Sequence, residues 1–360
     1  MKKILIPMRN MDPMDLSFSN QTKPLEIFYG TRDLLVDEKS VKWFNTARSE
    51  GTVCVRLGVS LLSKIFALRT RLGLPFEMVL NNKEECRTAE VIFCRTDSIS
   101  LAFLLAKYLG YVKGEVVTLF QSVVERDLKY FGRHRLWLYF VKKLIRQADY
   151  VLTLSHVAKN RMVARYEIDE KRISVFRFGI DLTFWGYRPW CSDRKMILSL
   201  GRDMNRDYGT LVRALADEHS LTIVTKKKVP QHKNLTIKSD LPYSEIASLY
   251  QAARLVVIPN LPLSFESAGL TTALQAMACG TPVIMADSPP MREYFTESKH
   301  IFFFKPQCAS SLLAVTREVY NDEQLLRAVS ERARQHVEDR FNILDTASQV
   351  RAMLMQRTGD

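Results

Sequence analysis

An acidic residue and a turn of small residues stand directly before a helix pattern in the C-terminal half of this sequence. Glu266 precedes the turn Ser267–Gly269, and the helix pattern begins at Leu270 and ends at Gly280. The free amide groups of a helix N-terminus can hold an anion such as a phosphate. A carboxylate just outside the turn can accept hydrogen bonds from hydroxyl groups of the same ligand. The spacing therefore predicts a site for a ligand with both phosphates and hydroxyls, as a nucleotide sugar has. The residues predicted to contact this ligand are Ser267, Ala268, Gly269, Leu270, Thr271 and Thr272.

Two arginines follow the apolar strand pattern that ends at Leu200. Gly201 and Arg202 come directly after it, and Arg206 precedes the next helix pattern. Open α/β sheets bind ligands at the carboxyl ends of their strands. A guanidinium stays charged and can bind a phosphate through two N–H groups. The pattern predicts a grip on a diphosphate, and a solvated arginine pair beside a helix start is the alternative.

Three lysines, Lys226–Lys228, follow the strand pattern Leu221–Thr225. They form either an ordinary solvated loop or a contact to the nucleotide, for which Lys226 is the candidate. The sequence alone leaves both interpretations open.

The segment Ser264–Asp287 resembles the donor-site signature of retaining glycosyltransferase family 4, also called glycosyl transferases group 1. Glu266-x-x-Gly269 and the run 276–283 match the pattern of that family. The family's second Glu is replaced by Gln275. The gap from Glu266 to Gln275 is also one residue longer than the gap between the two acids of the family. A buried helix with a Gly stop explains 276–283 equally well, but it does not explain Glu266 before a small-residue turn. The resemblance extends from about residue 148 to residue 341 and is weak before that.

This resemblance implies the fold, the reaction and the roles of single residues. The fold is α/β, the GT-B fold, with two Rossmann-like parallel-sheet domains that face each other across a cleft. The reaction moves a hexosyl-type unit from a nucleotide-diphosphate sugar to a saccharide or lipid-linked acceptor, with retention and front-face substitution. Glu266 positions the sugar, Arg202 and Arg206 stabilise the leaving diphosphate, and Gln275 takes the place of the acid that holds the ribose.

The sequence indicates neither a metal site nor a cofactor beyond the nucleotide sugar itself, which is a co-substrate. No Asp-x-Asp stands at a strand end, and the six histidines share no metal-ligand spacing. Two other functions stay open. The first is a nucleotide-sugar epimerase or phosphorylase of the same fold. The second is an inactive nucleotide-sugar-binding subunit, which the replacement by Gln275 would suit.

Composition and charge point to a globular protein with an anionic partner. Of the 360 residues 47% are hydrophobic and 25% are charged, and the six cysteines are scattered, as in a reducing compartment. We therefore expect a cytoplasmic protein, with peripheral attachment to the inner face of the plasma membrane as an open alternative. The net charge is +13, and residues 1–183 hold 30 Lys and Arg against 20 Asp and Glu. A basic N-terminal half implies an anionic partner there.

Two N-terminal segments mix cations with large apolar residues, as helices on anionic membranes do. They are 59–71 and 126–146. Ordinary domain helices with a basic solvated face are an equal alternative. Nucleic acid is not an expected partner, because no known nucleic-acid module is present.

Short apolar runs alternate with helix patterns, which is typical of parallel α/β domains. We predict an N-terminal acceptor domain at 1–183 and a C-terminal donor domain at 184–342. A C-terminal helix follows at 343–360, and its return to the N-terminal domain is left open. The predicted strands are Lys3–Pro7, Val91–Cys94, Glu115–Leu119, Tyr150–Thr153, Ile173–Arg177, Met196–Leu200, Leu221–Thr225, Leu235–Lys238, Leu255–Ile258, Pro282–Met285 and Ile301–Phe304.

Overall fold

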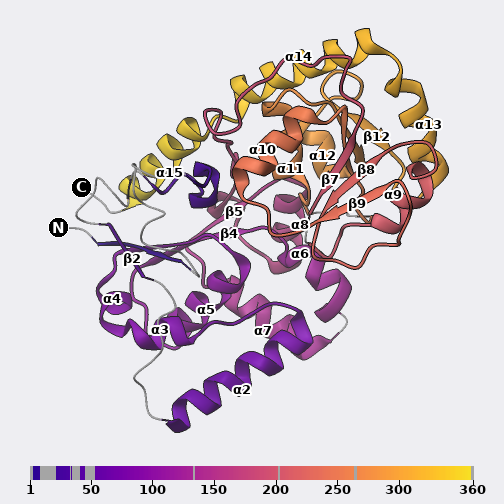
Figure 1. Ribbon diagram of the computed structural model, residues 1–360. Coiled ribbons are helices and arrows are strands. Elements are labelled where there is room, and N and C mark those ends of the chain that lie inside the picture. The colour runs from indigo at the N-terminus through magenta and orange to yellow at the C-terminus, as the bar shows by residue number, and fades with distance from the viewer. Residues whose placement is uncertain are drawn as a thin grey trace. The chain divides into compact units, whose positions relative to one another are not determined.

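The computed structural model describes residues 3–8, 22–32, 34, 41–44, 53–132, 134–201, 203–262 and 266–357. These residues form two compact units (Figure 1). The first unit holds the described residues within 1–20, 28–177 and 347–360, and the second holds those within 21–27 and 178–346. Each unit is built around its own parallel sheet.

The sheet of the first unit has six parallel strands in the order β2-β1-β3-β4-β5-β6. Their bounds are β1 Ile4–Pro7, β2 Val41–Phe44, β3 Val91–Cys94, β4 Glu115–Phe120, β5 Tyr150–Thr153 and β6 Ile173–Val175. Most of their residues are apolar and buried, as expected of a parallel sheet covered on both faces.

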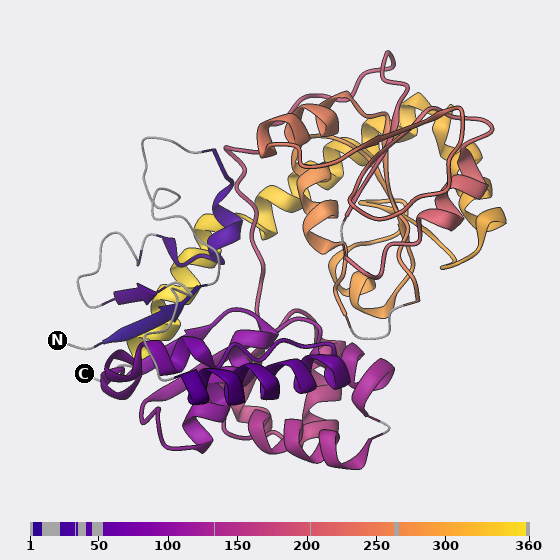
Figure 2. The ribbon, with the colours of Figure 1, turned by 60° about the horizontal axis from the view of Figure 1, so that its bottom comes forward.

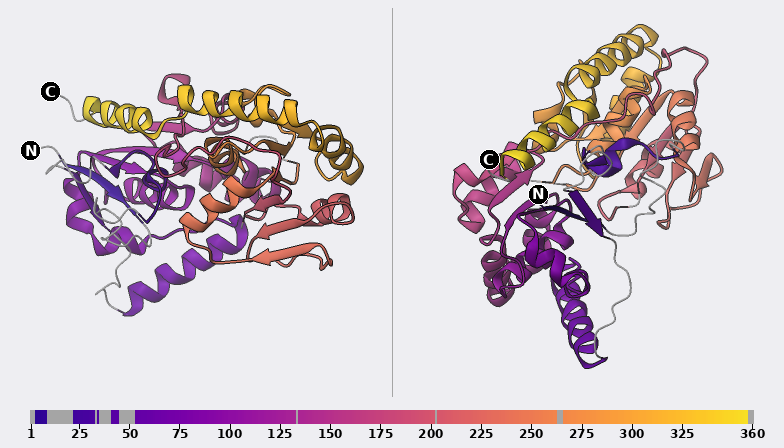
Figure 3. Two further views of the ribbon diagram at one scale, coloured as in Figure 1. Left: turned by 45° about the horizontal axis from the view of Figure 1, so that its top comes forward. Right: turned by 90° about the vertical axis from the view of Figure 1, so that its left-hand side faces the viewer.

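The first unit's helices connect and cover these strands, and the long helix α2 can be followed in Figures 2 and 3. Their bounds are α2 Val53–Thr70, α3 Glu77–Asn81, α4 Lys83–Thr88, α5 Asp97–Tyr108, α6 Val123–Arg126, η3 Asp127–Phe131, α7 Arg135–Ile145, α8 His156–Tyr166 and η4 Glu170–Arg172. Ser155 begins α8, and its side chain accepts a hydrogen bond from the amide of Ala158.

The sheet of the second unit is also six-stranded and parallel, in the order β12-β11-β10-β7-β8-β9. Its strands are β7 Ile197–Leu200, β8 Leu221–Val224, β9 Leu235–Lys238, β10 Leu255–Ile258, β11 Val283–Ala286 and β12 Phe302–Phe304. Its helices are α9 Tyr208–Leu215, α10 Tyr243–Ala252, α11 Leu270–Ala278, α12 Pro289–Tyr294, α13 Ala309–Tyr320 and α14 Glu323–Arg340. Two further elements are η2 Leu25–Phe28 and α15 Ile343–Arg357, whose residues are divided between the units.

Alternate residues of the second sheet point to opposite apolar layers. Leu255 and Val257 of β10 belong to a core cluster with residues of α9 and α13, while α11 packs on the other face. Because both faces are covered, the strand residues read as continuous apolar runs rather than as alternating ones.

Every strand predicted from the sequence is present, with ends within two residues of those expected. The sequence prediction missed β2, which lies at the edge of the first sheet. This strand has only four residues and includes the exposed Lys42, so it lacks a recognisable apolar run.

The division between the units lies between Arg177 and Phe178, earlier in the chain than the predicted boundary after residue 183. Residues 178–183 belong with the second unit because Asp181 accepts hydrogen bonds from the amides of Leu25, Thr183 and Phe184. Ile180 also pairs with Asn342 in an isolated parallel bridge. At the other end, the second unit continues to Thr346, and residues from 347 onward group with the first.

Candidate functional site

The order of the second sheet places two loops at the same carboxyl edge. From β7 the chain continues to β8 on one side, and it returns later to β10 on the other side. Such a reversal of strand order opens a crevice between the two loops that follow these strands. The loop after β7 carries Gly201 and Arg206, and the loop after β10 leads to Glu266 and the start of α11.

Backbone hydrogen bonds join these two loops. The amide of Leu261 donates to the carbonyl of Asn205 at 2.7 Å, and the amide of Asp207 donates to the carbonyl of Pro259 at 2.6 Å. Arg206 and Asn260 form an antiparallel bridge between these two contacts. The described parts of the loops are therefore fixed to each other by the backbone.

Arg206 is buried at the centre of this junction, with 4% of its surface exposed. Its Nε donates to the carbonyl of Leu200 at 2.9 Å, Nη1 donates to Oδ1 of Asn260, and Nη2 donates to Oγ1 of Thr272 at 3.2 Å. A guanidinium has five N–H groups, and these bonds use three of them. Gly201 is needed here, because a Cβ would lie 2.1 Å from Nε of Arg206.

Asn260 connects Arg206 to the turn before α11. Its Oδ1 accepts from Arg206, and its Nδ2 donates to the carbonyl of Ala268 at 2.7 Å. The side chain is 3% exposed. Asn260 was not among the predicted site residues, although a polar residue directly after a buried strand is a usable signal.

Glu266 lies at the same edge and is held by the loop after β7. Its Oε2 accepts a hydrogen bond of 2.6 Å from Nδ2 of Asn205. A carboxylate can accept several hydrogen bonds, so this contact orients Glu266 without exhausting its acceptor capacity.

The turn before α11 leaves donors unpaired. Gly269 has φ +89°, and a Cβ there would meet Ile258 at 2.8 Å, so only glycine fits. The amides of Leu270 and Ala273 bond within the turn. The amides of Thr271 and Thr272 find no acceptor among the described residues, as expected for the first turn of a helix.

Ser267 adds a further polar group to this turn. The residue is 8% exposed, and its hydroxyl has no hydrogen-bond partner in the described part of the chain. A buried hydroxyl without a partner is costly, which favours a ligand atom or water as its partner.

Gln275 lies one turn further along α11, where its amide is bonded to other side chains. Its Nε2 donates to Oε1 of Glu26 at 3.1 Å, and its Oε1 accepts from the hydroxyl of Tyr250 at 3.2 Å. Glu26 also accepts from Nε1 of Trp185 at 2.5 Å, and burial raises its pKa. The predicted ribose contact would have to use the remaining donor or acceptor capacity of this amide.

Of the three lysines after β8, Lys227 is the one that reaches the loop after β7. Its Nζ donates to the carbonyl of Arg206 at 2.7 Å. Lys226, the predicted nucleotide contact, is exposed and pairs with Asp240. The sequence could not show which of the three adjacent lysines bonds to the carbonyl of Arg206.

Most of the predicted residues therefore gather at one edge of the second sheet. Arg206 and Thr272 are in direct contact, and Asn260 links them to the turn of Ala268 and Gly269. Lys226 bonds elsewhere, and Arg202 lies outside the described residues.

The two basic segments predicted from the sequence lie in the first unit. Segment 59–71 falls largely on α2, and 126–146 covers η3 and α7. The helices pack through Phe66, whose ring lies 5.9 Å from that of Trp137 and 6.2 Å from that of Phe140. Each helix leaves apolar residues exposed, Leu61, Ile65 and Leu68 on α2 and Leu136 and Tyr139 on α7.

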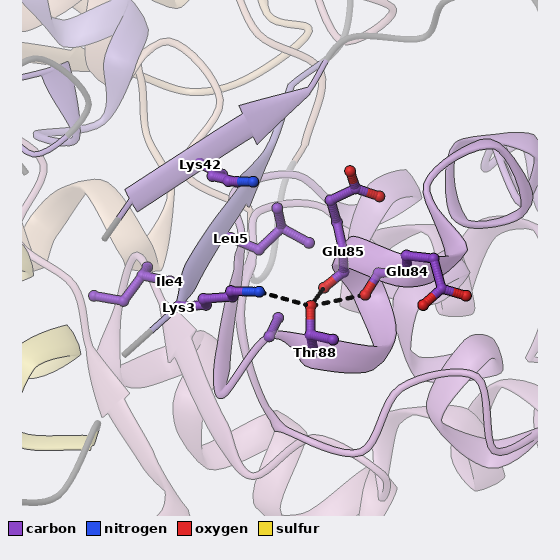
Figure 4. Close-up of a pocket in the computed structure, with 8 residues that line it drawn as sticks. Lys3, Ile4, Leu5, Lys42, Glu84, Glu85 and Thr88 are labelled. Carbon is purple, nitrogen blue, oxygen red and sulfur yellow. Dashed lines mark hydrogen bonds between the residues drawn. The ribbon is translucent and has the colours of Figure 1, made fainter. Parts of the chain in front are cut away.

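A further cavity and the metal-binding residue types bear on whether the protein has a second site. A small cavity of about 150 Å³ lies at the amino edge of the first sheet, where Lys3 donates to Thr88 at 3.5 Å (Figure 4). It is at the opposite edge from the strand ends that bind ligands in such folds. Across the described residues, no three His, Cys, Asp or Glu side chains form a group that could hold a metal ion. No helix within the described ranges is both long and apolar enough to span a bilayer.

Comparison with solved structures identifies the class of fold. Sucrose-phosphate synthase from Thermosynechococcus elongatus is 17% identical, with a TM-score of 0.72 over 99% of each chain. Anabaena HepE in complex with UDP and glucose is 14% identical, with a TM-score of 0.73 over 99% of this chain and 100% of that one. At this identity the likeness concerns the fold, and the predicted GT-B class with two Rossmann-like parallel sheets is confirmed.

Comparison with sequence families adds a narrower match. Residues 223–336 match the family described as Glycosyl transferases group 1, so the predicted resemblance is confirmed over this segment. The O-antigen chain mannosyltransferase RfbU of Salmonella typhimurium is 22% identical over 219 residues. That alignment covers 53% of this chain and 56% of the relative, so this chain matches about half the length of that curated protein.

Proposed function

We propose that this protein is a retaining glycosyltransferase. It would move a hexosyl-type unit from a nucleotide-diphosphate sugar to a saccharide or lipid-linked acceptor. The observation that carries the proposal is the junction at the switch point of the second sheet. There, Glu266 is oriented by Asn205, and the buried Arg206 contacts Thr272 in the first turn of α11. The match of residues 223–336 to Glycosyl transferases group 1 supports the same class of activity.

The chemistry follows from the charges that these groups can meet. Departure of a nucleoside diphosphate builds negative charge on its oxygens, and preorganised donors stabilise that charge. Arg206 would supply a fixed positive charge with two remaining N–H groups, and the amides of Thr271 and Thr272 would supply two further donors. Glu266 would accept hydrogen bonds from sugar hydroxyls, and the diphosphate would take the acceptor proton in a front-face substitution.

We propose that the reaction is independent of metal ions, because Arg206 and the amides of Thr271 and Thr272 would stabilise the charge on the leaving diphosphate. Its test is transfer in the presence of EDTA. Full activity supports this part of the proposal, and an absolute requirement for Mg²⁺ or Mn²⁺ contradicts it.

We further propose that the acceptor is handled by the first unit at the cytoplasmic face of an anionic membrane. The exposed apolar residues of α2 and α7 stand next to cations such as Lys64 and Arg135, which are themselves exposed. Apolar contact and attraction to anionic lipids reinforce each other in such helices. A lipid-linked acceptor would be presented at that surface.

One experiment separates the three candidate activities. The protein is incubated with nucleotide sugars, with and without a saccharide acceptor, and the release of nucleoside diphosphate is followed. Release that depends on the acceptor supports transfer. Conversion of the sugar without acceptor would instead indicate an epimerase, and saturable binding with no turnover would indicate a binding subunit.

A further inference from the structure

A second polar cavity lies in the second unit, formed by α12, the loop after it and the C-terminal half of α14. Its volume is about 500 Å³, within the range of small-ligand sites. Four cationic side chains line it against two acidic ones. The cations are Arg292, Lys299, Arg332 and Arg340, and the acids are Glu293 and Asp339.

Two stacked histidines form part of the lining. The rings of His300 and His336 lie 4.0 Å apart at an angle of 12°. Nδ1 of His300 accepts a hydrogen bond of 3.2 Å from the amide of Thr296, so the neutral ring carries its proton on Nε2. His336 contacts the carbonyl of Tyr294 through Nε2 at 2.8 Å.

The Nε2–H group of His300 donates no hydrogen bond to the described part of the chain. The residue is 7% exposed, and its Nε2 has no partner among the described residues. The ring N–H on Nε2 is accessible from the cavity and can donate to a ligand there. Asp339 accepts from Gln335 at 2.8 Å.

Two of the cations likewise have no bonding partner among the described residues. Lys299 and Arg340 form no ion pair or hydrogen bond with any described residue, whereas Arg292 is paired with Asp287 at 2.7 Å. Among the described residues, Arg332 donates to the carbonyl of Ser298, at 3.3 Å. Three exposed cations and one N–H donor therefore line this cavity and outnumber its two acidic side chains.

We propose that this cavity binds a small phosphate-bearing anion through Lys299, Arg332, Arg340 and the Nε2–H of His300. The ligand class is inorganic phosphate or a small phosphomonoester. A phosphate fits because it offers several acceptor oxygens to donors from different directions. The site is separate from the junction around Glu266, and it does not depend on the proposed transferase activity.

The electrostatics of the cavity give the binding a pH dependence. Burial, followed by His336 and the nearby Lys299, Arg332 and Arg340, lowers the pKa of His300 to about 4. Burial also lowers the pKa of His336, while Asp339 acts in the opposite direction. A bound anion raises the pKa of the His300 ring, so by linkage the anion binds more tightly as the pH falls.

The test follows the ring signals of His300 by NMR in the full-length protein. Inorganic sulfate is the first probe, because its charge does not change between about pH 5 and pH 8. Inorganic phosphate and glycerol 3-phosphate follow. The His300→Gln variant assigns the signal. We expect a saturable shift of the His300 ring with each anion, and tighter sulfate binding at lower pH.

The Lys299→Gln/Arg340→Gln variant should bind about tenfold more weakly or worse, because charged hydrogen bonds are lost. Neither side chain has a partner in the described chain, so the fold should be unaffected. The control is Lys305→Gln/Arg327→Gln, which removes the same charges from exposed positions of the same unit.

The proposal is overturned by the absence of a saturable shift, or by equal binding in the double variant. A shift seen only with phosphatidylglycerol vesicles would also overturn it, since the ligand would then be a lipid headgroup. Because the readout is the His300 ring, failure here leaves the transferase proposal untouched.

Discussion

Asn205 donates a hydrogen bond of 2.6 Å to the carboxylate of Glu266, across 61 residues of sequence. The contact joins the loop after β7 to the segment that leads into α11. It places the carboxylate beside the loop that contains Arg206, whose guanidinium reaches Thr272 in the first turn of α11. The positions of Glu266 and Arg206, to which we assign the sugar hydroxyls and the diphosphate in the proposed function, are thus coupled through two hydrogen bonds.

Replacing Glu266 by Gln should separate binding from transfer. The amide keeps the size of the side chain but no longer offers a charged acceptor to the sugar. We expect transfer to fall by about 10²-fold or more, because the sugar is no longer held in the reacting geometry. Affinity for nucleoside diphosphates, measured by calorimetry, should change little. Equal loss of binding and transfer would mean that Glu266 only maintains the loop. Asn205→Ala should lower transfer less, and it should have little further effect in the Glu266→Gln background.

Replacing Arg206 by Ala should weaken both folding and nucleotide binding. Asn260 would lose its guanidinium partner, and the carbonyl of Leu200 would lose a donor. Each charged hydrogen bond contributes about 1.5–3 kcal/mol, so the melting temperature should fall. The rise in melting temperature on addition of UDP, GDP or ADP should also disappear. Arg213→Ala is the control, because among the described residues this exposed arginine of α9 bonds only to Thr210, at 3.1 Å, within the same helix. If the variant keeps the nucleotide-induced rise, Arg206 does not contact the diphosphate.

The strands were predictable because parallel strands buried on both faces are continuous apolar runs, such as Leu255–Ile258. The start of α11 was predictable for a related reason. A glycine before an apolar helix pattern marks a turn, and Gly269 does take a positive φ. The strand β2 escaped prediction because four residues with an exposed Lys42 carry no periodic signal.

The interior of the site was less predictable, because it depends on contacts between distant residues. Asn260 and Asn205 are ordinary polar residues in sequence, and only the strand order brings them against Arg206 and Glu266. Among three adjacent lysines, only Lys227 reaches the loop after β7. Gln275 donates to Glu26, which is 249 residues away, beyond the reach of any local pattern.

Membrane attachment can be tested by reversing one charge on each exposed helix of the first unit. Lys64→Glu/Arg135→Glu should reduce co-sedimentation with anionic vesicles, because each cation near such a surface contributes about 1 kcal/mol. Salt at about 0.5 M should release the wild-type protein, since the Debye length falls to a few ångströms.

Lys305→Glu/Arg327→Glu carries the same charge change in the second unit and should sediment normally. Arg133 lies outside the described residues, and Lys142 pairs with Glu167, so neither gives as clean a test. Equal recovery on neutral and anionic vesicles would favour a soluble acceptor.

The stability of the second unit should depend on pH through His300. In the folded protein, burial and the neighbouring cations lower its pKa to about 4, against an ordinary value of 6.5. As the pH falls from 6.5 towards 4, the His300 ring becomes protonated in the unfolded chain but stays neutral in the folded protein. The free energy of unfolding should therefore fall over that range and level off below it. His300→Gln should flatten this slope in urea unfolding, and His134→Gln, an exposed position of the first unit, should not. The buffers must lack phosphate and sulfate, because a bound anion would mask the effect. An unchanged slope in His300→Gln would assign the pH dependence to other groups.

Gln275 stands at a position where the family resemblance implies an acid, and its hydrogen bond to Glu26 offers a reason within the fold. Its Nε2 donates to Glu26, a buried carboxylate that also accepts from Trp185 and from the amide of Asp181. Replacing Gln275 by Glu would set two carboxylates at hydrogen-bond distance in a buried site. Two such groups cannot both ionise cheaply, so they share a proton or repel each other. We expect Gln275→Glu to lose about 3 kcal/mol of unfolding free energy near pH 7.5. The loss should shrink at about pH 5.5, where one carboxyl group is more readily protonated.

The exchanged pair Glu26→Gln/Gln275→Glu is the decisive control for this prediction. It restores one donor and one carboxylate in reversed positions, so part of the lost stability should return. Gln275→Ala removes the donor without adding a charge and should show little dependence on pH. If Gln275→Glu is as stable as the wild type at both pH values, the carboxylate of Glu26 can move away from the side chain of residue 275. The replacement would then have to be explained by the ligand rather than by the fold. If the exchange restores stability, Glu26 and Gln275 together constrain which side chains α11 can carry at the site proposed for the nucleotide.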